Sequence, residues 1–387
     1  MSAPGPLGNT LLVHWGRTGG GPRVLEEMLD ALVARRPGEV YVSYNRDAEN
    51  AKSLAAASVP SLTVTTYRSA LGLLLKLPKM VVNSWRVRAF VRRHNVRTVV
   101  TTMEAFYQSM LMPLLLPRHV RYVFAIHDGN FHPGEGNLLV RMTRSVELRR
   151  ADEIITFSSA VADEVRRRVD LRGRRVTASI LPASDTRGIE SSARTLPSDR
   201  PLVLGFFGRL TAYKGLDILL ESARLLEETR QDIVVRIVGN GDLGRRLASE
   251  PSPSNVVWDV RWIPEEDVVP SVAAFDILAL PYTEASQSGV LAQALSLGVP
   301  AVATPVGGLA EQVTTSGGGV VADAVDAESF TRAVVALVED PDRYATISAA
   351  AVGASASDYS WDRFIDDLES VAAPQSEGSQ EDTQPGA

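Results

Sequence analysis

The sequence predicts an α/β protein of two domains, each built on a parallel sheet. Short runs rich in β-branched residues alternate with amphipathic helical stretches, a pattern typical of βαβ units. The chain has 387 residues, more than one hydrophobic core usually organises. Charge divides it as well: residues 1–185 carry 26 Lys and Arg against 16 Asp and Glu, and residues 186–387 carry 14 against 30. The basic first half therefore favours an anionic partner.

The first domain, residues 1–185, is predicted to hold six strands and a helix after the first of them. This helix extends from about Arg23 to Ala34 and follows a glycine-rich loop. Pro22 near its start suits a first helical turn. The predicted strands are Leu11–Trp15, Glu39–Ser43, Leu62–Thr66, Thr98–Thr102, Tyr122–Ile126 and Glu153–Phe157.

A polar linker at residues 186–200 leads to a second βα series over residues 201–358. Its predicted strands are Val203–Phe207, Val234–Val238, Val257–Trp262, Ile277–Leu280 and Ala301–Thr304. Its predicted helices lie near Gly215–Glu228, Gly289–Leu297, Ala327–Glu339 and Tyr344–Ala354. A last amphipathic helix within residues 359–372 is expected to return to the first domain. Residues 373–387 lack an apolar period and are predicted to be disordered.

Composition excludes several classes of protein and of site. The sequence contains no cysteine, so disulfides, thiolate zinc sites and cysteine nucleophiles are excluded. No secretory signal is recognisable at the start, and no apolar run is long enough to span a bilayer. A cytoplasmic location is expected, with peripheral contact to the inner face of the membrane through the apolar and basic segment Ala70–Arg97. A core-packed helix with solvated arginines is the alternative for this segment and is preferred to the membrane contact. No nucleic-acid partner is expected.

Two cations follow the first strand of the second domain. Gly208 and Arg209 come directly after Val203–Phe207, and Lys214 and Gly215 precede the next helix. Ligands of open α/β sheets bind at the carboxyl ends of strands. The planar fork of arginine and the mobile charge of lysine suit a diphosphate there. An ordinary loop with solvated cations is the alternative.

The segment Pro281–Gly298 forms a second candidate site for an anion. A loop of small residues follows the strand Ile277–Leu280, and a helix begins at Gly289. Backbone N–H groups and the positive helix end would then face the crevice and bind an anion without a metal. Ser286 or Ser288 as a plain N-cap is the alternative. Glu284 and Gln293 bracket this turn, where they either bind sugar hydroxyls or face solvent.

Three adjacent glycines follow the first strand of the chain. Gly19, Gly20 and Gly21 would let the backbone approach a diphosphate or an acceptor across the cleft, and a flexible loop is the alternative. The sequence G-x-G-x-x-G is absent from this loop, which argues against a nicotinamide cofactor. His127 and Asp128 directly follow the strand Tyr122–Ile126 and are expected at the cleft edge.

Weaker candidates for acceptor recognition are Glu104, His132 and Glu135. A solvated carboxylate is the alternative for Glu104. No second cluster of ligating residues accompanies them, so no metal is expected. The acidic string from Asp340 to Asp342 lies between two predicted helices and is interpreted as a helix stop and cap.

As a set, these motifs resemble the retaining glycosyltransferase family four. Its motifs are Gly-Arg-Leu followed by Lys-Gly, a Val-Gly-x-Gly turn, a Glu-bracketed loop and helix, and a Gly-Gly turn followed by Glu. In this chain they are Gly208–Leu210, Lys214–Gly215, Val238–Gly241, Glu284–Pro300 and Gly307–Glu311. The resemblance covers nearly all of residues 200–350. It implies the GT-B fold, in which two Rossmann-like doubly wound domains face each other across a cleft.

The resemblance also implies a function. It implies transfer of a sugar from a nucleoside-diphosphate sugar to a hydroxyl acceptor with retention, without metal or cofactor. The catalytic residues it implies are His127, Asp128, Arg209 and Lys214. The donor-binding residues it implies are Gly20, Gly21, Gly208, Gly239, Gly241, Glu284, Gln287, Ser288, Gly289, Val290 and Gln293. The sugar, the base, the acceptor and the oligomeric state stay open.

One departure from the family pattern concerns its paired glutamates. The second glutamate falls on Gln293 here, and Glu284 lies one position too early. The chain therefore looks like a variant subgroup in which Gln287, Ser288 and Gly289 take over contacts to the donor. Two alternatives remain: a GT-B sugar-nucleotide 2-epimerase, and a catalytically silent sugar-nucleotide-binding partner in envelope assembly.

Overall fold

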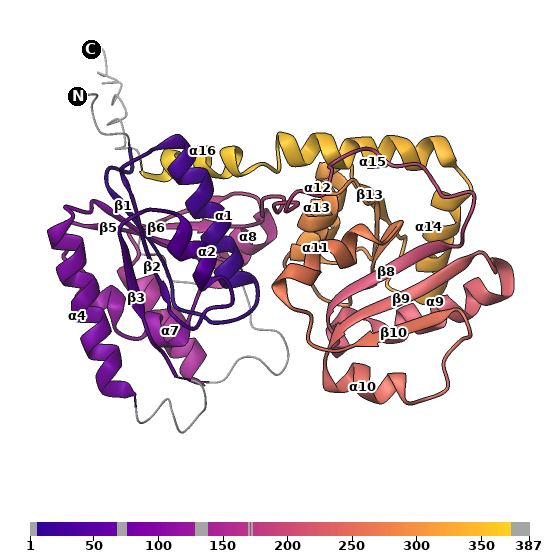
Figure 1. Ribbon diagram of the computed structural model, residues 1–387, viewed down its shortest axis with the longest axis horizontal. Helices are drawn as coiled ribbons and strands as arrows, with labels where there is room; N and C mark the ends of the chain where they lie inside the picture. The colour runs from indigo at the N-terminus through magenta and orange to yellow at the C-terminus, as the bar shows by residue number, and fades with distance from the viewer. Residues whose placement is uncertain (1–5, 68–75, 128–137, 169–170, 172, 373–387) are drawn as a thin grey trace, which may run out of the picture.

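The computed structural model consists of two parallel sheets, each with helices on both faces (Figure 1). It describes residues 6–67, 76–127, 138–168, 171 and 173–372. The first sheet has the strand order β3-β2-β1-β4-β5-β6-β7, and the second has the order β10-β9-β8-β11-β12-β13. Neighbouring strands pair in parallel throughout both sheets. The predicted architecture of two doubly wound α/β halves is confirmed.

The first half contains all six predicted strands, with ends shifted by at most two residues, and one further strand, β7. Its strands are β1 (Thr10–His14), β2 (Val40–Asn45), β3 (Ser61–Val64), β4 (Thr98–Thr101), β5 (Arg121–Ile126), β6 (Glu153–Thr156) and β7 (Arg175–Ala178). Its helices are α1 (Gly20–Arg35), α2 (Ala51–Ala56), α4 (Leu77–Arg93), α5 (Phe106–Ser109), α6 (Met112–Leu115), α7 (Leu138–Arg150) and α8 (Ser159–Arg168). The edge strand β7 buries only Val176, so its hydrophobic signal is weak.

The second half contains the five predicted strands and an additional edge strand, β13. Its strands are β8 (Leu202–Arg209), β9 (Ile233–Asn240), β10 (Val256–Val260), β11 (Ile277–Leu280), β12 (Ala301–Ala303) and β13 (Gly319–Val321). Its helices are α9 (Leu216–Thr229), α10 (Asp242–Ala248), α11 (Glu265–Ala273), α12 (Gly289–Ser296), α13 (Gly307–Ser316), α14 (Ala327–Val338) and α15 (Pro341–Ala356). Asp340 caps α15 by accepting a hydrogen bond from Arg343 N at 2.9 Å, which confirms the capping interpretation.

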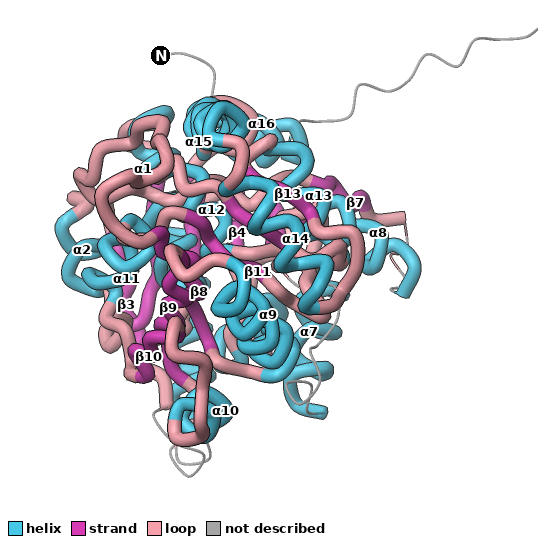
Figure 2. The backbone as a smooth tube through the Cα atoms, turned by 90° about the vertical axis from the view of Figure 1, so that its right-hand side faces the viewer, coloured by secondary structure: helices cyan, strands magenta, loops and turns pink. Residues whose placement is uncertain are grey.

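The last helix, α16 (Trp361–Ala372), packs on the first half of the chain. α15 lies on α12, α13 and α14, whereas α16 contacts α1 and β6, and the two helices follow one another along one side of both halves (Figures 1 and 2). Phe364 and Leu368 are buried in one core with residues of α1, and Phe364 stacks on Phe157 at 5.3 Å. The C-terminal end of the chain thus completes a core that the N-terminal end begins.

The segment predicted as a linker contains no helix or strand, but it is held on the second half. The Arg194 guanidinium donates hydrogen bonds to the carbonyl oxygens of Leu297, Ala273 and Phe275, at 2.9–3.1 Å. Its backbone N–H donates to Ser348 Oγ at 2.8 Å. The connection between the halves therefore lies before this residue, around Asp185.

Candidate active site

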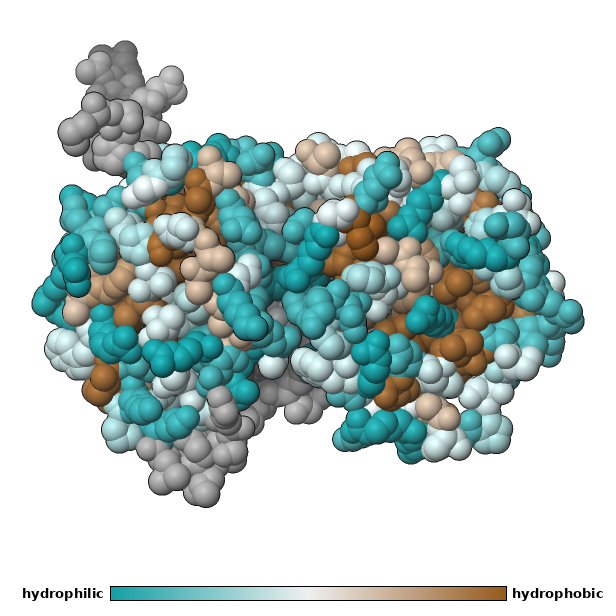
Figure 3. Space-filling view, in the orientation of Figure 1, coloured by the Kyte–Doolittle hydropathy of each residue, from teal (hydrophilic) through white to brown (hydrophobic). Residues whose placement is uncertain are grey.

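A cleft of about 930 Å³ lies between the two halves of the chain. In the first sheet the strand order reverses between β1 and β4, and in the second between β8 and β11. Ligands of open α/β sheets bind at such points, beyond the carboxyl ends of the strands. The cleft is lined by residues at or after strand ends from both sheets: His14, Met103, His127, Arg209, Asn240 and Trp262. Hydrophilic side chains gather where the two halves meet (Figure 3).

In the second half of the chain, the ends of β8 and β9 form the base of the cleft. Gly208 and Gly239 are paired in register, and both line the cleft. A Cβ atom on Gly239 would lie 1.8 Å from the Gly208 carbonyl oxygen, so only glycine allows this approach. Arg209 follows directly, lines the cleft and donates to Tyr213 Oη at 3.4 Å. Gly241 instead packs against the backbone of Leu210, outside the cleft lining.

Lys214 lies beside the segment Pro281–Gly298, outside the cleft lining. Its Nζ atom is 3.6 Å from the centroid of the Tyr282 ring, a cation–π contact. The backbone N–H of Thr283 donates to the Tyr213 carbonyl oxygen at 2.9 Å. The two segments that the sequence singled out for the donor are therefore joined side by side, although about seventy residues separate them.

The start of α12 opens into the cleft through Gly289 and Val290. Ser288 is buried, and its hydroxyl accepts a hydrogen bond from Leu291 N at 3.4 Å, so it is the N-cap of this helix. Gln287 is half-buried, and its Oε1 atom has no hydrogen-bond partner within the described ranges. Glu284 faces solvent. Neither Gln287 nor Glu284 lines the cleft.

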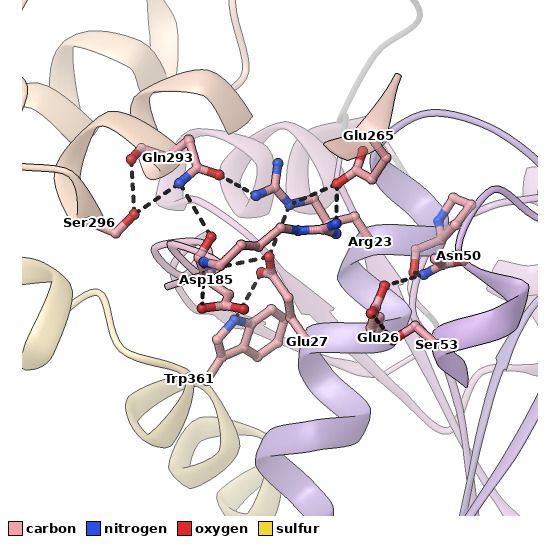
Figure 4. A network of polar contacts seen from close by, with 12 residues as sticks. Arg23, Glu26, Glu27, Asn50, Ser53, Asp185, Glu265, Gln293, Ser296 and Trp361 are labelled. Atoms are coloured by element: carbon pink, nitrogen blue, oxygen red, sulfur yellow. Dashed lines mark hydrogen bonds and ion pairs between the residues drawn. The ribbon is translucent and has the colours of Figure 1, made fainter. Parts of the chain in front are cut away.

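Gln293 is buried against the first half of the chain, so the interpretation of a solvent-facing side chain is wrong. Its Oε1 atom accepts a hydrogen bond from Arg23 of α1 (Figure 4). Its Nε2 atom donates to Ser296 Oγ at 3.2 Å and to the Asp185 carbonyl oxygen at 3.4 Å. The side-chain amide of Gln293, which occupies the family's second glutamate position, is thus hydrogen-bonded to other residues of the chain.

Arg23 is the centre of a polar network between the two halves (Figure 4). Its Nε atom lies 3.0 Å from Glu27 Oε1 and 3.6 Å from Glu265 Oε1. Trp361 of α16 donates to Glu27 Oε2 at 3.1 Å. Burial raises the pKa of Glu27 and of Glu265 despite the neighbouring arginine. Sequence analysis did not identify this network, because no local pattern links residues so far apart in the chain.

His14 at the end of β1 is a cleft residue that sequence analysis missed. Burial lowers its pKa to about 4, with a further contribution from nearby His127, so the imidazole is neutral at pH 7. Nδ1 lies 3.4 Å from the Met103 carbonyl oxygen, which can only accept, so Nδ1 carries the proton and Nε2 is left as an acceptor. A Cβ atom on Gly21 would lie 2.2 Å from Nε2. The reasoning applied to His127, a histidine at a strand end, also identifies His14.

The remaining first-half candidates occupy different surroundings. Gly20, Gly21 and His127 line the cleft. Asp128, His132 and Glu135 lie outside the described residues. Glu104 lines the cleft, but it forms a two-point ion pair with Arg144, at 2.5 and 3.0 Å. Both side chains are mostly buried, so the alternative of a solvated carboxylate is wrong.

Two absences apply to the part of the chain that the structure describes. No group of three or more His, Asp or Glu side chains there is placed to hold a metal ion. None of the helices described above combines the length and the apolar character that crossing a membrane requires.

Known proteins resemble both halves of the chain. Residues 201–340 match the family model described as "Glycosyl transferases group 1", and residues 18–178 match "Glycosyltransferase Family 4". A GDP-mannose-dependent alpha-(1-6)-phosphatidylinositol monomannoside mannosyltransferase of Mycolicibacterium smegmatis is 27% identical over 369 residues, covering 89% of this chain and 92% of that protein. A D-inositol 3-phosphate glycosyltransferase of Corynebacterium urealyticum is 30% identical over 233 residues, covering 55% of this chain. That match covers only 54% of the relative's own length, about half.

Solved structures share the fold. The crystal structure of Anabaena Alr3699/HepE in complex with UDP and glucose has a TM-score of 0.68 and 19% identity, covering 94% of this chain and all of that one. Sucrose-phosphate synthase from Thermosynechococcus elongatus has a TM-score of 0.69 and 17% identity, covering 93% of this chain and 96% of that one. At these identities the likeness shows the arrangement of the two sheets alone.

Proposed function

The chain belongs to glycosyltransferase family four and has the GT-B fold, and we propose that it transfers a sugar from a nucleoside-diphosphate sugar to a hydroxyl acceptor with retention. One observation carries this proposal. The strand ends of both sheets meet at one cleft, where Arg209 and the start of α12 face His127 and the glycine-rich loop. Neither the epimerase nor the silent partner is favoured by a comparable observation.

The donor diphosphate would lie between Arg209 and the start of α12. The guanidinium can bind two phosphate oxygens at once, and the N–H groups at Gly289 and Val290 add the positive end of a helix. Gly20 and Gly21 would approach from the first half, above the floor formed by Gly208 and Gly239. Charge that develops on the departing diphosphate is then stabilised without metal or cofactor.

Lys214 and Gln287 complete the proposed donor site. Lys214 acts as a mobile point charge, which requires its ammonium group to leave the face of Tyr282. The Oε1 atom of Gln287, which has no hydrogen-bond partner among the described residues, is an acceptor for a sugar hydroxyl. Ser288 contributes by starting α12. Gln293 ties the donor helix to α1 in place of binding the ribose.

In the transfer itself, the acceptor oxygen bonds to the anomeric carbon as the bond from that carbon to the diphosphate breaks. The hydroxyl proton passes to the departing diphosphate oxygen. His127 positions the donor sugar, together with Asp128 beside it in the sequence, and closure of the two halves aligns the acceptor and excludes water.

Trp262 is the proposed platform for the base. It follows β10, is 56% exposed and lines the cleft near Asn240. Stacking on an aromatic ring suits any nucleobase, because each has a π face. The position does not by itself select one base.

A peripheral membrane contact is proposed on α4, which belongs to the predicted segment Ala70–Arg97. This helix exposes Val82 and Trp85, by 56% and 53%. Its other exposed or half-exposed side chains include Lys79, Arg86 and Arg92. Exposed apolar side chains beside cations suit the surface of an anionic membrane.

The function is tested by incubating the purified chain with a panel of nucleoside-diphosphate sugars and hydroxyl acceptors. Arg209→Ala and Lys214→Ala are each expected to lower kcat/KM by about 10²-fold, the usual effect of removing one group that stabilises transition-state charge. Arg224→Ala, on the exposed face of α9, is the control. Full turnover by both Arg209→Ala and Lys214→Ala would contradict the diphosphate assignment, and conversion of a nucleotide sugar without acceptor would identify an epimerase.

A further inference from the structure

Glu265 is a cleft carboxylate to which the proposed transfer gives no role. It belongs to the first turn of α11, three residues after Trp262. Among the described residues from position 201 onward, it is the one acidic side chain that lines the cleft. Its side chain is 20% exposed, so part of the carboxylate is open to a ligand.

One of the two carboxylate oxygens holds Glu265 in place. Its Oε1 atom lies 3.1 Å from Arg187 Nη2 and 3.6 Å from Arg23 Nε. Its Oε2 atom has no hydrogen-bond partner among the described residues, and they do not bury it. The two arginines therefore fix the carboxylate, and Oε2 is left as an acceptor.

The other carboxylates that line the cleft have less acceptor capacity left. All three belong to the first half of the chain: Glu27, Glu49 and Glu104. Both Glu27 oxygens accept hydrogen bonds, from Arg23 Nε at 3.0 Å and from the Trp361 indole at 3.1 Å. Both Glu104 oxygens accept from Arg144, and Glu49 Oε1 accepts from Gly19 N.

A donor nucleotide bound as proposed would pass Glu265. Its ribose joins the base, on Trp262, to the diphosphate at the start of α12. Glu265 lies close to Trp262 in the chain, and Arg23 connects it to Gln293, one turn into α12 (Figure 4). Glu265 thus stands between the parts of the site that hold the two ends of the nucleotide.

The chemistry of a ribose favours Glu265 over Gln293 at this point of the cleft. A ribose presents two adjacent hydroxyl groups, and an ionised carboxylate is a pure acceptor with room for both protons. The Oε1 atom of Gln293 already accepts from Arg23, and its Nε2 atom donates to Ser296 and to the Asp185 carbonyl oxygen. Its amide therefore has little capacity left for a ligand.

We propose that Glu265 binds the ribose hydroxyl groups of the donor nucleotide. Hydrogen bonds from a hydroxyl to a carboxylate are charge-assisted and stronger than those between neutral groups. Arg23 and Arg187 are the positioning residues for this contact. The inference rests on the proposed use of a nucleoside-diphosphate sugar, and it names the residue that selects a ribonucleotide over a deoxyribonucleotide.

The experiment measures Kd by titration calorimetry for UDP and GDP, each beside its 2′-deoxy counterpart. Wild type is expected to bind the ribonucleotide about 10- to 100-fold more tightly, the worth of one hydrogen bond to a charged group. Glu265→Gln should bring this ratio close to one, because its amide oxygen stays with the arginines and its NH₂ group cannot accept. Glu266→Gln is the matched control, since the neighbouring glutamate is exposed and does not line the cleft.

The ratio separates ribose binding from a merely structural role of Glu265. Both nucleotides of a pair carry the same base and diphosphate, so a distorted cleft weakens both and leaves their ratio unchanged. Gln293→Ala is expected to keep the wild-type ratio. A ratio that Glu265→Gln leaves at the wild-type value overturns the proposal, and loss of the ratio in Gln293→Ala alone would place the ribose at Gln293.

Binding and transfer are read separately, which keeps this inference apart from the transferase function. A ribose preference that depends on Glu265, without transfer to any acceptor of the panel, contradicts the transferase function alone. Transfer by wild type that uses ribonucleotide and deoxyribonucleotide sugars equally overturns the role of Glu265 alone. Failure of every nucleoside diphosphate to bind would overturn both.

Discussion

Arg23 of α1 donates a hydrogen bond to the side-chain oxygen of Gln293 of α12, and so connects two helices whose first turns line opposite walls of the cleft (Figure 4). The same guanidinium reaches Glu265 at the start of α11. One side chain therefore links the glycine-rich loop, the donor helix and the segment that follows Trp262.

Removal of this arginine is expected to lower stability. Arg23→Ala leaves Glu27 largely buried without its cation and leaves Glu265 with Arg187 alone, which costs about 2–4 kcal/mol of the apparent free energy of unfolding. Gln293→Ala removes a neutral partner and costs about 1–2 kcal/mol. Urea unfolding measures both, with Arg224→Ala as the surface control. If Arg23→Ala and Arg224→Ala unfold at the same urea concentration, the network contributes no stability.

The packing of His14 on the glycine-rich loop is tested by a double-mutant cycle. Gly21→Ala places a Cβ atom 2.2 Å from His14 Nε2 and is expected to cost about 1–3 kcal/mol through overpacking. The same substitution in a His14→Ala background costs much less, because the ring is gone. Gly20→Ala is the matched control, since a Cβ atom there meets nothing within 4 Å. Equal costs of Gly21→Ala in both backgrounds would show that the ring does not restrict this position.

Stability is expected to fall as the pH rises through the titration of Glu147. This side chain is buried and accepts a hydrogen bond from Tyr122 Oη, and burial raises its pKa to about 8. Between its unfolded pKa near 4.5 and 8, the native state binds more protons than the unfolded state, so the free energy of unfolding decreases with pH. The decrease reaches up to about 1.4 kcal/mol per pH unit.

Glu147→Gln stays neutral at every pH and removes this contribution. Urea unfolding of both proteins at about pH 5, 6.5 and 8 gives the comparison, because these values span the window between the two pKa values. The wild type should lose stability relative to the variant at each step. Parallel profiles would mean that the pKa of Glu147 is not raised in the folded protein.

Trp262 is expected to strengthen binding of the donor nucleotide. Stacking of a base on an aromatic ring contributes about 1–3 kcal/mol, so Trp262→Ala should raise the donor Kd by about 10-fold or more. Trp262→Phe retains part of the affinity. Trp85 is equally exposed, at 53% against 56%, but lies on α4, so Trp85→Ala is a matched control for calorimetric titration. An unchanged Kd in Trp262→Ala would place the base elsewhere.

The same pair of tryptophans, with their roles exchanged, tests the membrane contact. Trp85→Ala and Val82→Ser should reduce co-sedimentation with vesicles of anionic lipid, because both remove exposed apolar surface from α4. Binding should also weaken with added salt, which screens the arginines of this helix. Trp262→Ala should bind as wild type does. Wild-type protein that remains in the supernatant at low salt would rule out the contact.

Much of the fold could be predicted because the signals for strands, helices and turns lie within a few consecutive residues. The central strands of both sheets are covered on both faces, so they read as continuous apolar runs. The edge strands β7 and β13 escaped prediction because β7 buries one side chain and β13 has three residues and none fully buried. Cleft positions such as His127, Arg209 and Gly289 followed from the rule that parallel strands end at one edge.

The sequence by itself determined two parallel-sheet halves and the strand ends where a ligand would enter, because apolar periodicity and glycine turns act over a few residues. Only the tertiary structure decided what those side chains do. It gave Gln293 a partner 270 residues away, placed Lys214 over an aromatic ring and left the Arg17 Nε atom without a hydrogen-bond partner among the described residues. Contacts of this kind depend on how the two halves face each other, and the pKa values depend on how far each side chain is removed from water. No local sequence pattern encodes either.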